Sequence, residues 1–247
     1  MILSAAQTMP VAKSIKGNLE DHYRLIKIAA DNGAGLLVFP EMSITGYFRE
    51  GASEFAFTVN DKQLDTLRTL AIEHKMIVIA GAPIQIKSKV YIGSFILHPN
   101  GILNIYTKQY LHPGEEEFFD ASLDYNPIIE LGDERISLAI CADIDNPLHP
   151  EAAGKNSTTL YIPSIFFSKK SMDNCHKTLR QYARQYNMNI LMSNYYGNLW
   201  GTEAGGKSAF WSNNGKLISE LDESSEGIVL VEKYNDNWNG KIIVTNL

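Results

Sequence analysis

Three reactive side chains stand at the ends of predicted strands or in adjoining loops: Glu41, Lys108 and Cys141. Each follows an apolar run that can fix the backbone, and the cysteine comes directly after the run Ile136–Ile140. Rigid strands that present polar residues at their ends are a common way to build a site. A thiol, a carboxylate and an amine in one place would suit nucleophilic attack on a carbon centre.

The chemistry assigns a role to each of these groups. A cysteine thiol has a pKa of about 8.5, so it needs a base or a nearby cation to attack at neutral pH. We expect Glu41 to take the proton of Cys141. Lys108, as an ammonium ion, would favour both the thiolate and the carboxylate and could donate to the oxyanion that forms on the substrate. The backbone N–H of Ala142 is the expected second oxyanion donor.

Each residue taken alone also has an ordinary explanation. A cysteine at the end of an apolar strand is more often core than catalyst, and a glutamate or lysine beyond a strand is usually solvated. Only the combination favours chemistry. The second cysteine, Cys175, stands next to His176 on a predicted helix, where adjacent residues point in different directions, so no Cys-His pair is expected there.

The elements that must position these groups alternate between strands and helices. Apolar residues at three- and four-residue spacing predict helices, and short apolar runs bounded by turn residues predict strands. The predicted helices cover 18–32, 61–75 and 172–187; the predicted strands cover 2–7, 36–39, 76–82, 90–98, 102–106, 136–140, 158–163, 188–194, 208–212, 216–221, 227–233 and 241–245. Turn residues at 99–101 and 213–215 predict two hairpins. This order indicates an α/β fold, and the lack of any repeat or linker predicts one domain over residues 1–247.

The composition indicates a soluble globular protein with a small-molecule substrate. The chain has 247 residues, 45% of them hydrophobic, and a net charge of −6 with scattered Lys and Arg, so neither nucleic acid nor a membrane surface is an expected partner. Its apolar runs fall short of the roughly 18 residues that a membrane span needs. The N-terminal segment resembles a first strand rather than a secretion signal, which predicts a cytoplasmic protein whose two cysteines are thiols.

Three segments, LVFPEMSITGY, YTKQYLHPGEEEFF and ICAD, resemble the signature segments of the nitrilase superfamily, the carbon–nitrogen hydrolases with a Glu-Lys-Cys triad. The resemblance covers most of the chain. It implies that Glu41 is the general base, Lys108 the electrostatic stabiliser and Cys141 the nucleophile. It further implies a four-layer α-β-β-α sandwich that associates as a homodimer or a larger homo-oligomer.

The resemblance also implies no metal and no organic cofactor. In agreement with this expectation, the six His residues are scattered, and the chain contains no HExxH, GxGxxG or Walker pattern.

Members of this superfamily also use a second glutamate downstream of the lysine. The chain offers Glu115, Glu116 and Glu117 in a row. The family's usual spacing to an aromatic pair, here Phe118 and Phe119, selects Glu115, with Glu116 as the next choice.

The segment after the cysteine departs from the family pattern. Asp143 is kept, but the pair Pro150 and Glu151 comes later than usual, after the inserted residues DNPLH. We expect this longer turn to reshape one wall of the pocket. The tail segment GGKSAFW and the aromatic residues before it, Tyr195, Tyr196 and Trp200, could shape the acyl pocket or a subunit contact; alternatively, Phe210 and Trp211 alternate between core and surface in an ordinary strand.

These residues predict a hydrolase that cleaves a non-peptide carbon–nitrogen bond of a small amide or carbamoyl compound through a cysteine thioester. One alternative is nitrile hydrolysis on the same triad. A second is a binding or assembly protein that keeps the scaffold without turnover. A third is a papain-like thiol hydrolase in which His149 rather than Glu41 serves the cysteine.

Overall fold

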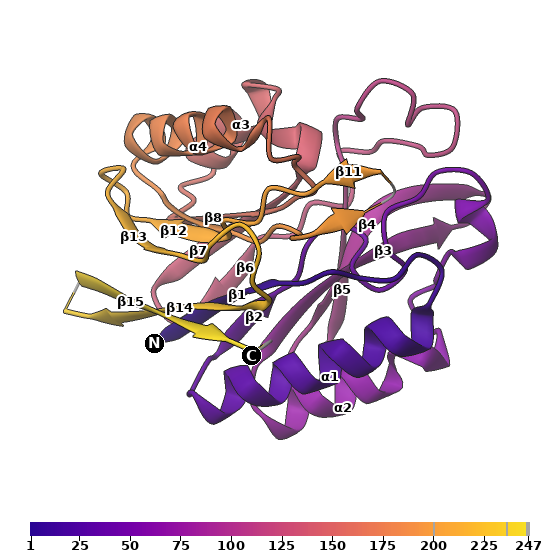
Figure 1. The fold of residues 1–247 in the computed structure, drawn as a ribbon, viewed down its shortest axis with the longest axis horizontal. Coiled ribbons are helices and arrows are strands. Elements are labelled where there is room, and N and C mark those ends of the chain that lie inside the picture. Colours follow the sequence, from indigo (N-terminus) through magenta and orange to yellow (C-terminus); the bar gives the residue numbers. More distant parts are fainter. Residues whose placement is uncertain (200, 236, 246–247) are drawn as a thin grey trace.

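Two β-sheets lie face to face between two pairs of helices (Figure 1). The computed structural model describes residues 1–199, 201–235 and 237–245. Trp200, one of the aromatic residues considered for the acyl pocket, lies outside them. The layers follow the order helices, sheet, sheet, helices, as the resemblance to the nitrilase superfamily implied.

The first sheet has seven strands in the order β15-β14-β1-β2-β3-β4-β5. Strands β1, β2 and β3 run parallel, and the other neighbours pair antiparallel. The strands are β1 (Ile2–Gln7), β2 (Leu36–Val38), β3 (Ile77–Ile86), β4 (Lys89–Leu97), β5 (Leu103–Thr107), β14 (Gly227–Tyr234) and β15 (Asn237–Val244). The carboxyl ends of parallel strands meet at one edge of a sheet, which is where ligands bind in open α/β folds.

The second sheet has six strands in the order β13-β12-β9-β8-β7-β6, with β7, β8 and β9 parallel. The strands are β6 (Ile129–Leu131), β7 (Glu134–Ile140), β8 (Leu160–Ser164), β9 (Asn189–Met192), β12 (Ala209–Trp211) and β13 (Leu217–Glu220). A small separate hairpin joins β10 (Asn198–Leu199) to β11 (Thr202–Glu203).

Each sheet is covered on its outer face by two helices (Figure 1). The helices are α1 (Ile15–Asp31) and α2 (Asp65–Glu73) over the seven-stranded sheet, and α3 (Leu148–Lys155) and α4 (Met172–Tyr186) over the six-stranded sheet; short 3-10 turns are η1 (Ala52–Phe55), η2 (Lys62–Leu64) and η3 (Cys141–Ile144). Helix α4 shows why such segments pack: Cys175, Leu179, Tyr182 and Ala183 recur on one face, and all four are buried.

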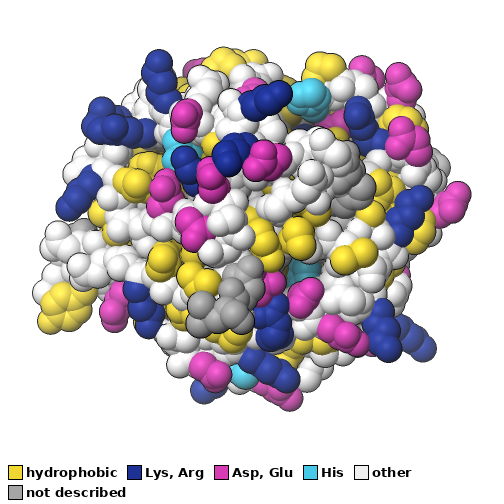
Figure 2. Space-filling view, in the orientation of Figure 1, with side chains coloured by type: hydrophobic (Ala, Val, Ile, Leu, Met, Phe, Trp, Pro, Cys, Tyr) yellow, Lys and Arg dark blue, Asp and Glu magenta, His cyan; other side chains and the backbone are white. Residues whose placement is uncertain are grey.

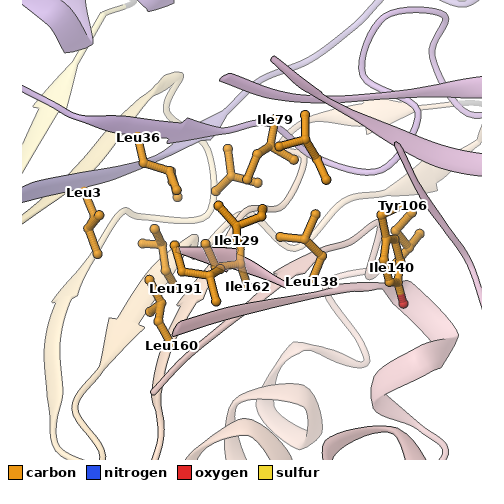
Figure 3. Packing of buried hydrophobic residues seen from close by; sticks show 14 of the residues in the cluster. Leu3, Leu36, Ile79, Tyr106, Ile129, Leu138, Ile140, Leu160, Ile162 and Leu191 are labelled. Carbon is orange, nitrogen blue, oxygen red and sulfur yellow. The ribbon is translucent and has the colours of Figure 1, made fainter. Parts of the chain in front are cut away.

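The central core lies between the sheets (Figure 3). Leu3, Leu36 and Ile79 of one sheet face Leu138 and Ile162 of the other, and all five are buried. Burying such a side chain stabilises a fold by about 1.5–3 kcal/mol. This apolar interface fixes the two sheets against each other and therefore fixes the strand ends that carry the reactive groups.

The α/β prediction is confirmed, and all three predicted helices form. Both predicted hairpins are present, as β4–β5 and β12–β13. The sequence did not predict β6, which is only three residues long, α3, which contains a proline and a glycine, or the short strands β10 and β11. Strand β15 begins at Asn237, before the predicted residue 241.

Lys, Arg, Asp and Glu side chains are interspersed on the face shown in Figure 2. Within the described residues, no helix is long and apolar enough to cross a membrane.

Candidate active site

Glu41 is held in a tight turn against strand β3. The chain leaves β2 through Pro40, and Met42 has a φ of 51°. A Cβ on Gly81 of β3 would lie 2.4 Å from the Met42 nitrogen and 2.9 Å from the Pro40 oxygen, so only glycine allows this approach. The turn leaves the Glu41 side chain fully buried.

Lys108 follows β5 immediately and is anchored by its own backbone, since its N–H donates to the carbonyl of Ile92 at 2.8 Å. Its side chain is fully buried. The ammonium group donates to a carboxylate oxygen of Glu41 at 2.8 Å and to the carboxylate of Glu115 at 2.9 Å. One lysine therefore joins two acids that are distant in the sequence.

The structure selects Glu115 from the three consecutive glutamates. Glu115 is buried, whereas Glu116 and Glu117 are exposed. Its carboxylate accepts hydrogen bonds from the Tyr47 hydroxyl and the His112 backbone N–H, both at 2.8 Å. Three groups, the Glu41 carboxylate, the Tyr47 hydroxyl and the His112 N–H, thus converge on the ion pair of Lys108 and Glu115.

Cys141 stands at the end of β7 with a φ of 46°, in the left-handed region that few non-glycine residues adopt. This conformation turns the chain sharply into η3 and leaves the sulfur 3.9 Å from the Phe166 carbonyl oxygen. Cys141 is buried, with 9% of the residue exposed. The Ala142 N–H lies in the first turn of η3, where a helix has no carbonyl of its own to accept it.

Charge and burial together set the protonation of these groups. Burial raises the pKa of Glu41 to about 7, although the neighbouring Lys108 ammonium counteracts part of this effect. Burial alone would lower the pKa of Lys108, but the Glu41 and Glu115 carboxylates raise it well above its usual value. Burial, reinforced by the charge of Glu41, raises the pKa of Cys141. The resting site therefore holds a neutral thiol, an ammonium ion and a carboxyl group that titrates near neutrality.

One oxygen of Glu41 is left free to act as a base. Its Oε2 is buried and has no hydrogen-bond partner among the described residues. The Cys141 thiol lowers the pKa of Glu41, and the charge of the Glu41 carboxylate raises the pKa of Cys141, so the two groups are neighbours. An unpaired buried carboxylate oxygen is unfavourable for stability, which is typical of a group kept for function.

Aromatic side chains surround the thiol and the glutamate. The rings of Tyr47 and Phe166 lie 5.5 Å apart, and those of Phe166 and Tyr195 lie 5.3 Å apart. Tyr195 lies in the segment after β9, and its buried hydroxyl donates to the backbone carbonyl of Glu41 and so holds the glutamate turn. Tyr195 thus belongs to the site, and nothing in the local sequence indicates its contact with Glu41.

The longer turn after the cysteine forms one side of an open depression beside Ala142. The depression has a volume of about 710 Å³; its lining includes Ala142, Asp145, Asn146 and Pro147 from the turn and Gln109–Pro113 from the lysine segment. Asp145, Asn146 and Pro147 thus lie beside the expected oxyanion donor.

His149 does not serve the cysteine. Both of its ring nitrogens face tyrosine hydroxyls, those of Tyr106 and Tyr161, each at 2.8 Å. Neither nitrogen is available to Cys141, which argues against the papain-like alternative. Within residues 1–199, 201–235 and 237–245 no three His, Cys, Asp or Glu side chains are grouped so that they could hold a metal ion.

Comparison with known proteins gives consistent similarities. A family model described as carbon-nitrogen hydrolase matches residues 2–233. The "Hydrolase in agr operon" of Staphylococcus aureus is 27% identical over 208 residues, which make up 81% of this chain and 79% of that protein. A glutamine-dependent NAD(+) synthetase of Thermotoga maritima is 27% identical over 165 residues, which make up 61% of this chain; the chain spans only 27% of the synthetase. An amidase from Nesterenkonia sp. has the same fold, with a TM-score of 0.85 at 21% identity, over 96% of this chain and 91% of that chain.

Proposed function

Because the chain belongs to the carbon–nitrogen hydrolase family of the nitrilase superfamily, we propose that it hydrolyses a small amide or carbamoyl compound through a thioester on Cys141. The observation that carries this proposal is the contact of one buried ammonium group, that of Lys108, with both Glu41 and Glu115 beside the thiol. Groups with such perturbed pKa values, gathered around a nearly buried nucleophile, are typical of active sites.

In the first half of the reaction, Glu41 accepts the thiol proton while the sulfur of Cys141 bonds to the carbonyl carbon. The carbonyl oxygen becomes an oxyanion, which Lys108 and the Ala142 N–H stabilise. The carbon–nitrogen bond then breaks, and the nitrogen leaves as ammonia or an amine with the proton that Glu41 received.

In the second half, Glu41 removes a proton from water as the water oxygen bonds to the thioester carbon. The carbon–sulfur bond breaks, the acid leaves, and the proton on Glu41 returns to the sulfur of Cys141. The same carboxyl group thus accepts and returns one proton in each half-reaction. This task suits a group whose pKa is about 7, because its two protonation states are then both accessible at neutral pH.

Glu115 supports the lysine rather than the substrate in this scheme. Its carboxylate is already occupied by Lys108, Tyr47 and the His112 N–H. A second fixed negative charge keeps the lysine protonated and holds its ammonium group in one place. Lys108 can then donate to a developing oxyanion without rearrangement.

Amide hydrolysis has two alternatives. The first is nitrile hydrolysis by the same thiol, and the second is a binding protein that has the same fold without turnover. Attack on a nitrile would use the same thiol, so the side chains do not separate it from amide hydrolysis. The binding alternative has less support, because burying several ionisable groups together is costly unless their chemistry is used.

A substrate panel tests the proposal. We expect purified protein to release ammonia from small amides or carbamoyl compounds, with a Cys141→Ala variant inactive and a Cys175→Ala variant close to wild type, since Cys175 lies buried at the contact of α4 with the sheet. A glutamate-to-glutamine mutant of the Nesterenkonia amidase bears the acetamide moiety of fluoroacetamide on its active-site cysteine. We expect fluoroacetamide to add the same moiety to Cys141. Release from nitriles alone would favour the nitrile alternative, and the absence of turnover and of adduct would refute the proposal.

Self-association as a homodimer or a larger homo-oligomer stays a prediction. Sedimentation velocity or light scattering at several protein concentrations measures the mass directly, and a monomer throughout would contradict it.

A further inference from the structure

Asp143 joins the two segments that carry the thiol and the amine. Its fully buried carboxylate accepts the backbone N–H of Ile140, just before Cys141, at 2.8 Å. Its other oxygen accepts the N–H groups of Gln109 and Tyr110, the two residues after the lysine, at 2.9 and 2.8 Å. One carboxylate therefore sets the distance between the cysteine turn and the lysine segment.

A chain of buried side chains holds this carboxylate in turn. The Tyr106 hydroxyl donates to Asp143 at 2.7 Å. Because that proton is used, the Nε2 of His149 must donate to the Tyr106 oxygen, which lies 2.8 Å away. His149 Nδ1 is then the acceptor for the Tyr161 hydroxyl at 2.8 Å. The hydrogen bonds run in one direction, from Tyr161 to Asp143, and need a neutral imidazole.

The surroundings of His149 favour this neutral form. His149 is 4% exposed, and burial lowers its pKa. The ionisable groups facing it are the Asp143 carboxylate, whose Oδ2 lies 4.0 Å from Nε2, and the hydroxyls of Tyr106 and Tyr161; the ring of Tyr110 also packs against it. A neutral ring with Nε2 protonated satisfies every one of these hydrogen-bonding groups.

We propose that Tyr106 and His149 are positioning residues for the hydrolysis, which hold Asp143 so that Lys108 and Cys141 keep the spacing that the reaction needs. This inference rests on the proposed function, because it assigns these residues to that reaction. Tyr106 lies on β5, two residues before Lys108, and Asp143 accepts hydrogen bonds from the two residues after Lys108, so both sides of Lys108 are tied to the cysteine turn. A displacement of reacting groups by 1 Å can cost about a hundredfold in rate.

Four variants separate positioning from simple packing. Tyr106→Phe and His149→Leu break the chain of hydrogen bonds, whereas His149→Gln keeps an N–H donor near the Nε2 position. Tyr182→Phe is the matched control. The buried Tyr182 hydroxyl donates to the Ile144 carbonyl of the same η3 turn at 3.0 Å, but it does not bond to Asp143. All are compared as folded protein, verified by circular dichroism and urea unfolding.

We expect Tyr106→Phe and His149→Leu to lower kcat at least about tenfold with little change in KM, because the chemical step needs the alignment and binding does not. His149→Gln should recover most of the loss, and Tyr182→Phe should keep wild-type kcat. The rate at which iodoacetamide alkylates Cys141, followed by peptide mapping, should show the same order, since the thiolate is the form that reacts and the positioned Glu41, as proton acceptor, and Lys108, as cation, favour it.

The alkylation rate also separates this inference from the proposed function. If the wild type hydrolyses no amide, the proposed function fails while the alkylation series still reports on the thiol. Positioning is refuted if Tyr106→Phe and His149→Leu alkylate and turn over as fast as Tyr182→Phe, or if KM rises while kcat stays constant. It is also refuted if His149→Gln is as impaired as His149→Leu while both unfold at the same urea concentration.

Discussion

Raising the pH from 5 to 8 should increase the activity of this protein and decrease its stability, both through Glu41. Glu41 must be ionised to accept the thiol proton, and burial raises its pKa to about 7. With this pKa, Glu41 is ionised in only about one molecule in ten at pH 6. We therefore expect kcat/KM to fall about tenfold for each pH unit below the pKa of Glu41.

The stability change has the opposite sign. Burial raises the pKa of Glu41 from 4.5 in an unperturbed chain to about 7 in the fold, so the folded state binds this proton more tightly than the unfolded state. The protonated carboxyl therefore contributes stability that is fully present below pH 4.5 and is lost as the pH rises through 7. The contribution is about 3 kcal/mol, because each tenfold change in proton affinity is worth about 1.4 kcal/mol.

Glu41→Gln isolates this effect, because glutamine has a similar shape and does not titrate. Urea unfolding of wild type and variant between pH 4.5 and 8.5 gives the two free energies of unfolding. We expect the wild type to lose about 3 kcal/mol relative to the variant as the pH rises across this range. The variant should also lose about 10²- to 10⁴-fold in kcat, the usual contribution of a general base.

Two results would refute this reasoning. The first is a constant difference in unfolding free energy between the two proteins across the whole range. The second is an activity profile whose acid limb has its midpoint near pH 4.5, the ordinary value for an exposed glutamate.

Three further substitutions test the rest of the site. Cys141→Ala should fold normally and lose on the order of 10⁴-fold or more in kcat, as measured by ammonia release. Lys108→Met should lower the free energy of unfolding by about 3–5 kcal/mol and abolish activity, because it leaves buried carboxylates without their cation; urea unfolding that matches wild type would contradict this. Gly81→Ala should cost about 1–3 kcal/mol and lower kcat, since its Cβ would meet Met42 at 2.4 Å, whereas Gly35→Ala, with its nearest neighbour at 3.7 Å, should behave like wild type in both measurements.

The local pattern of the chain was sufficient for the main elements. Apolar runs before Glu41 and Cys141 predicted strands there, and the recurrence of apolar residues over 172–187 predicted α4. The sequence did not predict short or interrupted elements. Strand β6 is too short to show alternation. Helix α3 has Pro150 and Gly154 within eight residues, so tertiary packing rather than local propensity decides that it is helical.

The choice among the three glutamates shows how far spacing alone reaches. The family spacing favoured Glu115, but only the burial of Glu115 and the exposure of Glu116 separate them physically. Neighbouring residues with identical side chains differ solely in the direction in which the backbone points them. That direction depends on the turn from His112 to Phe119, which the tertiary contacts fix.

By itself, the sequence determined which groups are available for chemistry and that each follows an element able to hold it. It did so because reactivity belongs to the side chain, and periodic burial to the local pattern of residues. The tertiary structure alone decided that Lys108 touches Glu41, 67 residues away, and that the Tyr195 hydroxyl, from the segment after β9, reaches the same glutamate. Such contacts, and the pKa of about 7 that burial gives Glu41, depend on how two sheets pack, which no local pattern encodes.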